Sequence, residues 1–283
     1  MNRTYILRRM LKSKFFMLGV FGVTLMSLMV IISPLIIVHD PYTSSLTEKF
    51  IGPQFLQYGW NGFVFGTDSM GRDVLTRLLI GGRYSLTIAI CSAVISALIG
   101  ITLGMLSGYF GGAFDIAIMG VCDVMSSFPV LLLAIVAVSI FGTSIPVLII
   151  TMSLCSWVGF ARLSRNNVLT LRNREFVLAA KALGASSPHI IAKEIFSNIT
   201  TPLLIQFSQS IGTMIKLEAS LSFLDMGVPS PLPSWGSMIS AGRSFVVIAP
   251  WVVVAPACFL AFTILSFSFL GDGLRDVLDP KAF

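Results

Sequence analysis

The sequence predicts an all-α polytopic membrane protein with six transmembrane helices. Of its 283 residues, 55% are hydrophobic and only 11% are charged, a balance that a water-soluble domain of this length rarely shows. Six mainly apolar runs of roughly 20 residues, the length that crosses a bilayer, follow one another along the chain. No linker is long enough to set a soluble domain apart.

The first run follows a basic segment, is too long for a signal-peptide core and lacks a small-residue cleavage site, so we expect it to remain as an anchor. The glycine-rich segment Gly108–Gly112 is expected to turn the chain between the second and third spans. The six spans are expected at Phe15–Val38, Ser85–Ser107, Ala117–Phe141, Ile145–Leu163, Ile199–Leu224 and Val246–Leu270.

The distribution of positive charge predicts the orientation. With the N-terminus inside, 13 Lys and Arg fall on cytoplasmic segments and five on external ones, as the positive-inside rule requires. Both termini are then cytoplasmic. The expected organisation is a basic N-terminus at 1–14, a first span at 15–38, an external loop with an amphipathic helix at 39–84, a core at 85–271 with a cytoplasmic loop at 164–198 and an external loop at 225–245, and a cytoplasmic C-terminus at 272–283.

The net charge of +6 and the four cysteines point to no ligand of their own. The basic residues lie mainly beside apolar runs, where anionic lipid head groups explain them better than nucleic acid. Each cysteine falls inside an apolar run, without the spacing of metal ligands, which indicates small buried hydrophobic residues and predicts no metal site.

The loop EFVLAAKALGASSPHIIAKEIFSN, from Glu175 to Asn198, is the most polar long segment in the second half of the chain. Phe176, Ala179, Ala180 and Leu183 recur at helical spacing, and Gly184 is placed to end that helix. Ser187 can cap a second helix with Pro188 at its first position, in which Ala192, Ile195, Phe196 and Ile199 repeat the spacing. Two helices this short need another surface to cover their apolar faces.

Two other interpretations of this loop are a hairpin lying on the membrane surface and a DNA-binding helix-turn-helix. The second is disfavoured because its recognition helix would carry one Lys and no Arg or Asn/Gln pair to contact bases.

The loop also resembles the EAA loop of ABC-importer permeases. Four further stretches are similar to the dipeptide, oligopeptide and nickel permeases of the DppC/OppC-like family: FGTDSMGRDVLTRLLIGGRYSL from Phe65, GYFGGAFD from Gly108, EASLSFLDMGVPSPLPSWGSMI from Glu218 and GDGLRDVLDP from Gly271. Lys216 departs from the apolar residue usual in that family. The resemblance implies the fold of a type I importer permease, with coupling to the ATPase assigned to Glu175, Ala179, Ala180, Leu183, Gly184, Ile190, Ile191 and Ile195.

The same resemblance implies partners. The chain contains no G-x-x-x-x-G-K-[ST] motif, so ATP and Mg²⁺ are expected in two separate ATPase subunits and no cofactor is expected on this chain. A companion permease (DppB/OppB-like) and an extracytoplasmic solute-binding protein complete the implied assembly in a bacterial cytoplasmic membrane. Docking of the binding protein is assigned to Asp68, Gly71, Arg72, Asp73, Trp235 and Gly236, although a solvated helix and an interfacial tryptophan anchor explain the same residues.

Ionisable residues inside predicted spans are candidates for the translocation pathway, because a charge at mid-bilayer costs roughly 2.5–3.5 kcal/mol. Lys216 and Glu218 lie two positions apart, roughly 200° around a helix, and therefore cannot pair face to face. Asp123, near the inner end of the third span, is a weaker candidate that suits a helix start equally well.

The function expected from the sequence is therefore that of a permease subunit, not an enzyme, that carries short peptides. Nickel or a metal chelate is the alternative within the family, although only His39 and His189 are available as imidazole ligands. An intramembrane enzyme and a stand-alone secondary transporter are alternatives from other classes; the first lacks a membrane-embedded base and the second a clear repeat.

Overall fold

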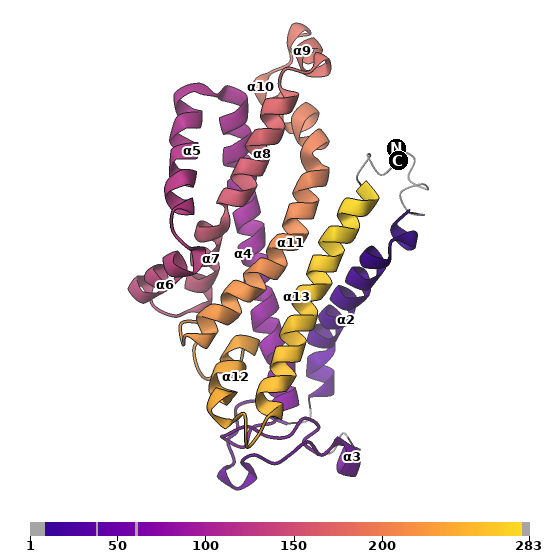
Figure 1. Ribbon diagram of the computed structural model, residues 1–283, viewed down its shortest axis with the longest axis vertical. Coiled ribbons are helices and arrows are strands. Elements are labelled where there is room, and N and C mark those ends of the chain that lie inside the picture. Colours follow the sequence, from indigo (N-terminus) through magenta and orange to yellow (C-terminus); the bar gives the residue numbers. More distant parts are fainter. Residues whose placement is uncertain (1–8, 38, 60–61, 279–283) are drawn as a thin grey trace.

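The structure, a computed structural model, describes residues 9–37, 39–59 and 62–278 and is built of helices, with one isolated bridge between Thr67 and Asp73 as the only β pairing in these ranges (Figure 1). The long helices run side by side along the molecule. The helices are α2 (Lys14–Ile36), α3 (Phe55–Tyr58), α4 (Val74–Phe110), α5 (Gly112–Ser126), α6 (Val130–Phe141), α7 (Ile145–Ser156), α8 (Val158–Leu171), α9 (Glu175–Ala182), α10 (Ser187–His189), α11 (Phe196–Phe223), α12 (Trp235–Gly242) and α13 (Trp251–Leu278), with single turns at Leu46–Glu48 and Arg243–Phe245.

Within the described residues, four helices are long and apolar enough to cross a membrane: α2, α4, the joined α7 and α8, and α13. The bent pair α5 and α6 raises the number to five if it counts as one span. This confirms the polytopic all-α class. The fifth predicted span forms α11, which has 28 residues but is not among the helices that meet this test of composition, since Lys216, Glu218 and many Ser, Thr and Gln residues lie along it.

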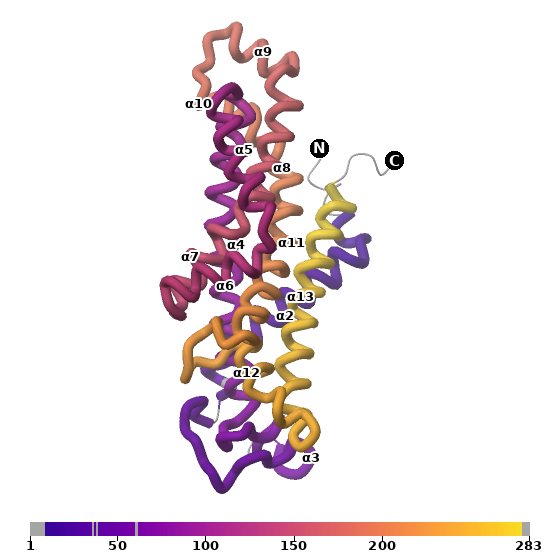
Figure 2. The backbone as a smooth tube through the Cα atoms, turned by 60° about the vertical axis from the view of Figure 1, so that its left-hand side comes forward, coloured from indigo at the N-terminus to yellow at the C-terminus, as the bar shows by residue number. Residues whose placement is uncertain are grey.

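The third predicted span, Ala117–Phe141, is not one straight helix. It breaks at Ser127–Pro129 into α5 and α6, whose axes differ by 90°. Pro129 causes the break, because a proline disfavours helical backbone at the residue before it and has no N–H for the helix ladder. As a result α6 projects sideways from the bundle (Figures 1 and 2).

The second predicted span begins earlier than expected. Its helix, α4, starts at Val74 because the Asp73 side chain caps it, accepting a hydrogen bond from the N–H of Thr76 at 3.0 Å. The external amphipathic helix expected at 39–84 is therefore the first turns of α4. At the other end α4 runs to Phe110, and the predicted glycine turn is confined to Gly111 and Gly112, both with positive φ.

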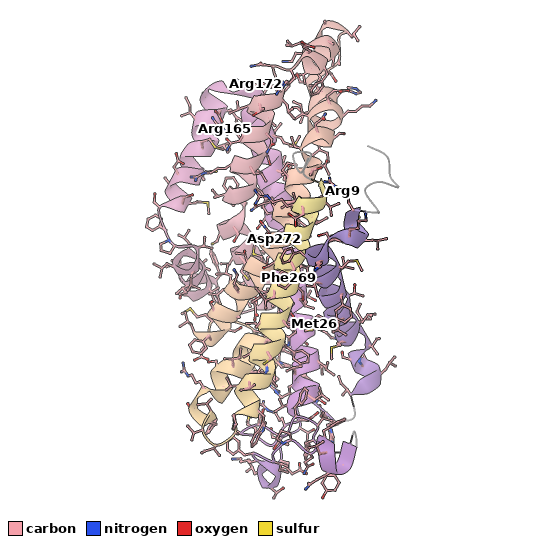
Figure 3. All side chains as sticks on the ribbon, turned by 45° about the vertical axis from the view of Figure 1, so that its right-hand side comes forward. Arg9, Met26, Arg165, Arg172, Phe269 and Asp272 are labelled. Atoms are coloured by element: carbon pink, nitrogen blue, oxygen red, sulfur yellow. The ribbon has the colours of Figure 1, made fainter. Side chains whose placement is uncertain are left out.

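The first and last of the long helices, α2 and α13, lie beside one another. The first predicted span forms α2, although Val38 lies outside the described residues, and α13 continues eight residues past the predicted end of the last span. Arg9 donates a hydrogen bond to the carbonyl oxygen of Val277 at 3.5 Å, and the rings of Phe15 and Phe269 lie 5.7 Å apart. Figure 3 shows Met26 and Phe269 along this α2–α13 contact.

The α9 end of the bundle and the opposite end, which carries α3 and α12, are connected by α4 and α11, while α13 runs from the α12 end only part of the way along the bundle (Figure 2). We call the second of these the α12 end. The main core cluster joins α2, α4, α6, α7, α11, α12 and α13, while a smaller cluster lies beneath α9.

A glycine seam holds α4 against α8. A Cβ atom on Gly104 would collide with the backbone of Ala161, and one on Gly100 would lie within 2.6 Å of the Phe160 Cβ. Such small residues at four-residue spacing let two membrane helices approach closely. Beside the seam, Arg165 on α8 forms an ion pair with Asp115 on α5 at 2.5 Å, and Arg172 donates to the Gly108 carbonyl oxygen at 3.0 Å (Figure 3).

The seam predicts opposite effects for the same substitution at two helical glycines. Gly104→Ala should destabilise the protein by about 1–3 kcal/mol, the usual cost of overpacking, and lower the midpoint of thermal unfolding in detergent. Gly120→Ala on α5, where a Cβ meets nothing within 4 Å, should be neutral or stabilising by up to about 1 kcal/mol. Equal midpoints for the two variants would contradict the seam.

Candidate functional site

The loop between α8 and α11 projects beyond the other helices at one end of the molecule (Figure 1). Its first helix, α9, ends as predicted at Gly184, which has φ +82°. The N–H of Ala185 donates to the carbonyl oxygen of Ala180, and the N–H of Gly184 to that of Lys181, both at 3.0 Å. These two bonds form a Schellman turn, which needs a left-handed residue at this position.

The two faces of α9 have different environments. Val177 is fully buried in the cluster beneath the loop, which also contains Met105 and Val168. The opposite face is open: Leu183 is 88% exposed, and Phe176, Leu178, Glu175 and Ala179 are also exposed, while Ala180 is partly buried. The predicted stripe of Phe176, Ala179 and Leu183 is thus uncovered in the chain alone.

The second predicted helix of the loop is not a separate element. Its N-cap is Ser186 rather than Ser187, and it continues through a π-helical segment at Ile190–Ile195 directly into α11. Ile190 and Ile195, assigned above to ATPase contact, are buried in the same cluster as Val177, and Ile191 is partly buried. These isoleucines hold the loop in place and present little surface to a partner.

Glu218 lies at a junction of three helices and is fully buried. Its carboxylate accepts hydrogen bonds from the hydroxyls of Ser222, on its own helix at 2.8 Å, and of Ser85 on α4 at 3.2 Å. Ser85 Oγ also accepts from the N–H of Trp235, and Ser222 Oγ lies 3.2 Å from Ser234 Oγ at the N-cap of α12. In the chain alone this residue contacts neither lipid nor an open pathway.

Lys216 lies on the opposite side of α11 and is exposed. It lines an open groove of about 560 Å³ together with Leu131, Ser220, Phe223 and Leu260. Among the described residues that line this groove, Lys216 carries the only charge, and most of the others are apolar.

Asp123, the third pathway candidate, forms an ion pair with Arg162 on α8 at 2.8 Å. Both side chains remain accessible, at 74% for Asp123 and 44% for Arg162. The pair therefore lies on an open face of the chain formed by α5 and α8.

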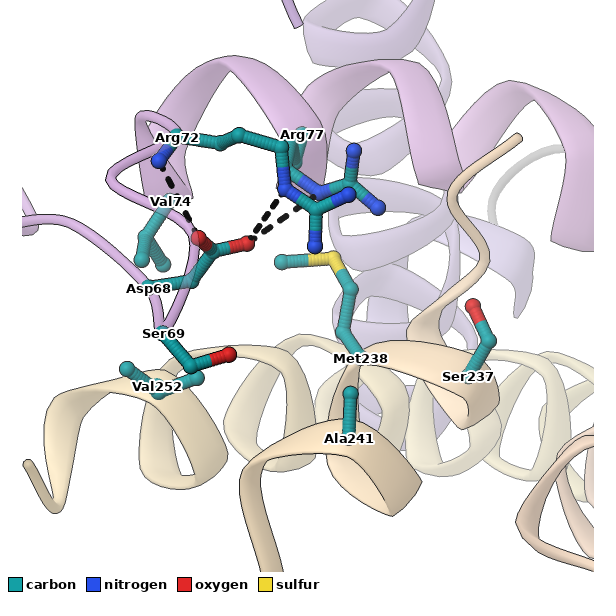
Figure 4. Close-up of a pocket in the computed structure, with 9 residues that line it drawn as sticks. All are labelled: Asp68, Ser69, Arg72, Val74, Arg77, Ser237, Met238, Ala241 and Val252. Carbon is teal, nitrogen blue, oxygen red and sulfur yellow. Dashed lines mark hydrogen bonds and ion pairs between the residues drawn. The ribbon is translucent and has the colours of Figure 1, made fainter. Parts of the chain in front are cut away.

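At the α12 end, Asp68 organises the loop that precedes α4 (Figure 4). One carboxylate oxygen accepts the N–H groups of Met70 and Arg72, at 2.8 and 3.0 Å. The other forms ion pairs with Arg72 Nε at 2.8 Å and Arg77 Nε at 3.7 Å. Asp68 is buried and serves the loop rather than a free surface.

Other residues assigned to docking are also internal. Asp73 caps α4, and a Cβ on Gly71, which has φ +74°, would collide with the Ser45 carbonyl oxygen. Trp235 is fully buried, with its indole N–H bonded to the Leu78 carbonyl oxygen at 3.0 Å, so it neither anchors at the membrane interface nor forms part of a surface. Gly236 lets α12 lie against α11, within 2.7 Å of Ala219 and Ser222 for an added Cβ.

Two exposed residues of this loop escaped the sequence analysis. Leu46 is 73% exposed and Met70 46%, and the hydrogen bond from the Ser45 N–H to the Met70 carbonyl oxygen holds their backbones together. Large apolar residues in a polar loop are the signal that would have found them.

Long apolar helices around a polar one, with a loop that projects from one end, define a polytopic membrane protein (Figure 1). A family model for a binding-protein-dependent transport system inner membrane component matches residues 100–283, and a model for the N-terminal TM domain of oligopeptide transport permease C matches residues 4–53. The chain belongs to this family of ABC-transporter permeases and is therefore an inner-membrane permease subunit. The two alternative hypotheses, an intramembrane enzyme and a stand-alone secondary transporter, are wrong.

Two relatives extend the likeness over most of the chain. The oligopeptide transport system permease protein OppC of Escherichia coli (strain K12) is 43% identical over 221 residues, which cover 78% of this chain and 73% of that protein. The glutathione transport system permease protein GsiD of Shigella flexneri serotype 5b (strain 8401) is 46% identical over 217 residues, which cover 77% and 72%.

The fold also resembles a solved structure. A chain from an inward-facing structure of the MetNI methionine ABC transporter aligns with a TM-score of 0.58 and 18% identity, over 71% of this chain and 97% of that one. This likeness supports the permease fold.

We call the hydrogen-bonded group of Glu218, Ser85 and Ser222 the serine junction. It predicts how Glu218 variants behave. Glu218→Leu removes the acceptor of Ser85 and Ser222, and each stranded buried group costs about 1–3 kcal/mol. The midpoint of thermal unfolding in detergent should fall clearly, whereas Glu218→Gln keeps an acceptor and should lower it less. Ser220→Ala, which removes an exposed hydroxyl bonded to the Lys216 carbonyl, is the control and should change little. Equal losses for the Leu and Gln variants would contradict the junction.

Proposed function

We propose that the chain forms one half of the translocation pathway of an ATP-driven importer of short peptides. The similarity to OppC and GsiD carries this proposal, since both are named for peptide cargo: oligopeptides for the first, and glutathione, itself a tripeptide, for the second. Lys216 suits such cargo, because an ammonium group in an apolar groove attracts a peptide carboxylate.

The other half of the pathway is a companion permease of the same family, which covers the face formed by α5 and α8. Asp123 and Arg162 support this placement. A charged group that faces lipid is costly, up to roughly 2.5–3.5 kcal/mol at mid-bilayer, and a companion chain or a water-filled pathway removes that cost.

Two ATPase subunits bind at the α9 end, which is cytoplasmic in this proposal together with both termini, and a binding protein docks at the α12 end. The exposed face of α9 supports the first contact. Leu183 and Phe176 are large apolar residues on a projecting helix, and such residues gain most when a partner surface excludes water.

Reconstitution tests the proposal. Proteoliposomes that contain this chain, its companion permease, the ATPases and the binding protein should accumulate a labelled tripeptide only when ATP is present on the ATPase side and the binding protein on the other. Uptake that persists without the ATPases, or accumulation of Ni²⁺ but of no peptide by the complete system, would contradict it.

The coupling face makes a separate prediction. Leu183→Asp should reduce the ATPase that co-purifies with the chain at least tenfold, because it places a charge in an apolar contact, which corresponds to about 1.4 kcal/mol. Leu56→Asp is the matched control, since Leu56 is 97% exposed on α3 at the other end. Membrane insertion should stay normal for both. Normal ATPase recovery with Leu183→Asp would show that this face points to solvent.

A further inference from the structure

A cavity of about 390 Å³ lies at the α12 end, between the Asp68 loop, α12 and the segment 225–232. Arg72 and Arg77 line one side of it, and Asp225, Ser222 and Ser237 line other parts. Its size falls within the range of small-ligand pockets. Figure 4 shows the smaller pocket next to it, with the two arginine side chains together beside Asp68, and Ser237 and Ala241 across from them.

The two arginines have more hydrogen-bond donors than the loop uses. Arg72 donates through Nε to Asp68, while Arg77 pairs with the same carboxylate through Nε and donates through one terminal nitrogen to the Pro41 carbonyl oxygen at 2.9 Å. Among the described residues nothing accepts from the other terminal nitrogens of either arginine, and none of these nitrogens is sealed from solvent. The cluster of Asp68, Arg72 and Arg77 therefore carries one uncompensated positive charge.

Burial strengthens the attraction between this positive charge and an anionic ligand. The side chains of Arg72 and Arg77 are only 13% and 8% exposed, so water screens them less than it screens a surface residue. A guanidinium group with free terminal N–H groups matches the geometry of a carboxylate, to which it can donate two parallel hydrogen bonds.

The cavity also offers the opposite charge. Asp225 is exposed on its lining and is held by a left-handed backbone with φ +60° at the end of α11. Its Oδ1 atom accepts a hydrogen bond from Ser240 Oγ at 3.4 Å, while its Oδ2 atom has no partner among the described residues and can accept from an ammonium group. A cavity with charges of both signs fits a zwitterion better than a single acidic side chain.

We propose that this cavity is a staging site that receives a peptide in its free zwitterionic form outside the membrane, its carboxylate on Arg72 and Arg77 and its ammonium on Asp225. The proposal rests on the proposed function for its cargo class. The low exposure of the two arginine side chains favours a small molecule that enters the cavity over a side chain of the docked binding protein.

Thiol protection tests the site without transport. Ala241→Cys places a thiol on the cavity lining, in the assembled transporter freed of its four native cysteines. The rate of modification by an externally added anionic methanethiosulfonate is measured with increasing trialanine, with trialanine amide and with N-acetyl-trialanine. Trialanine should protect the thiol, and each blocked peptide should need at least tenfold more for half protection. Leu56→Cys, remote on α3, should show no protection.

Two substitutions test which charged residue binds which end of the peptide. Arg72→Gln should slow modification by the anionic reagent and abolish the preference for trialanine over its amide. Asp225→Asn, an exposed position that the fold tolerates, should abolish the preference for trialanine over N-acetyl-trialanine and keep the preference over the amide. This variant keeps the test decisive if Arg72→Gln disturbs the Asp68 loop.

Three results would overturn the proposal: no protection by trialanine, equal protection by all three peptides, or protection by cargo-free binding protein that Arg72→Gln removes. The last would assign the arginines to the binding protein. Since the readout is modification of a thiol, failure here combined with normal tripeptide uptake rejects the staging site alone, whereas absent uptake rejects the proposed function.

Discussion

The buried carboxylate of Glu218 constrains the rest of the structure. A carboxyl group with no exposure must find its hydrogen bonds inside the protein, and it finds them on Ser85 and Ser222. Because Ser85 also accepts the N–H of Trp235, one polar group ties together the helices α4, α11 and α12. Trp235 then fills the space between α12 and α4, and its indole N–H has its own acceptor there, the carbonyl oxygen of Leu78.

The same helix that carries Glu218 connects the two ends of the molecule. The chain is helical without interruption from Ser187 to Phe223, through the π-helical segment at Ile190–Ile195. At one end Ile190 and Ile195 lie in the cluster that supports α9, and at the other Ser222 lines the cavity with Arg72 and Arg77. One continuous helical element therefore links the α9 loop to the α12 end, with the π-helical segment near the α9 loop and Glu218 near the α12 end.

The positions of most helices and the end of α9 could be predicted from the sequence. Which part of the chain or which partner buries each apolar face could not. The end of α9 at Gly184 followed from the glycine, and most helix positions followed from apolar runs. Periodicity placed Ile195 on an apolar face correctly, but a pattern does not say whether the chain itself or a partner covers that face. The family resemblance implied a docking role for Trp235 and Gly236, but the structure buries both, because a likeness to an external loop does not say which of its residues face outward. The bend at Pro129 also has a local cause in the sequence, since a proline disfavours helical backbone at the residue before it, although the apolar run across it predicts one straight span.

Lys216 and Glu218 show why a helix rich in polar residues belongs in such a membrane protein. Their angular separation of roughly 200° places them on opposite sides of α11, and the structure gives each a different environment. The inner side satisfies Glu218 with the hydroxyls of Ser85 and Ser222, while the outer side leaves the ammonium group of Lys216 in an apolar groove. The average hydropathy of α11 includes both sides of the helix. For this reason α11 does not meet the test of composition that α2, α4 and α13 meet. Charged and polar residues on a helix need partners or water rather than a high apolar average, and α11 provides such partners for Glu218 within the chain.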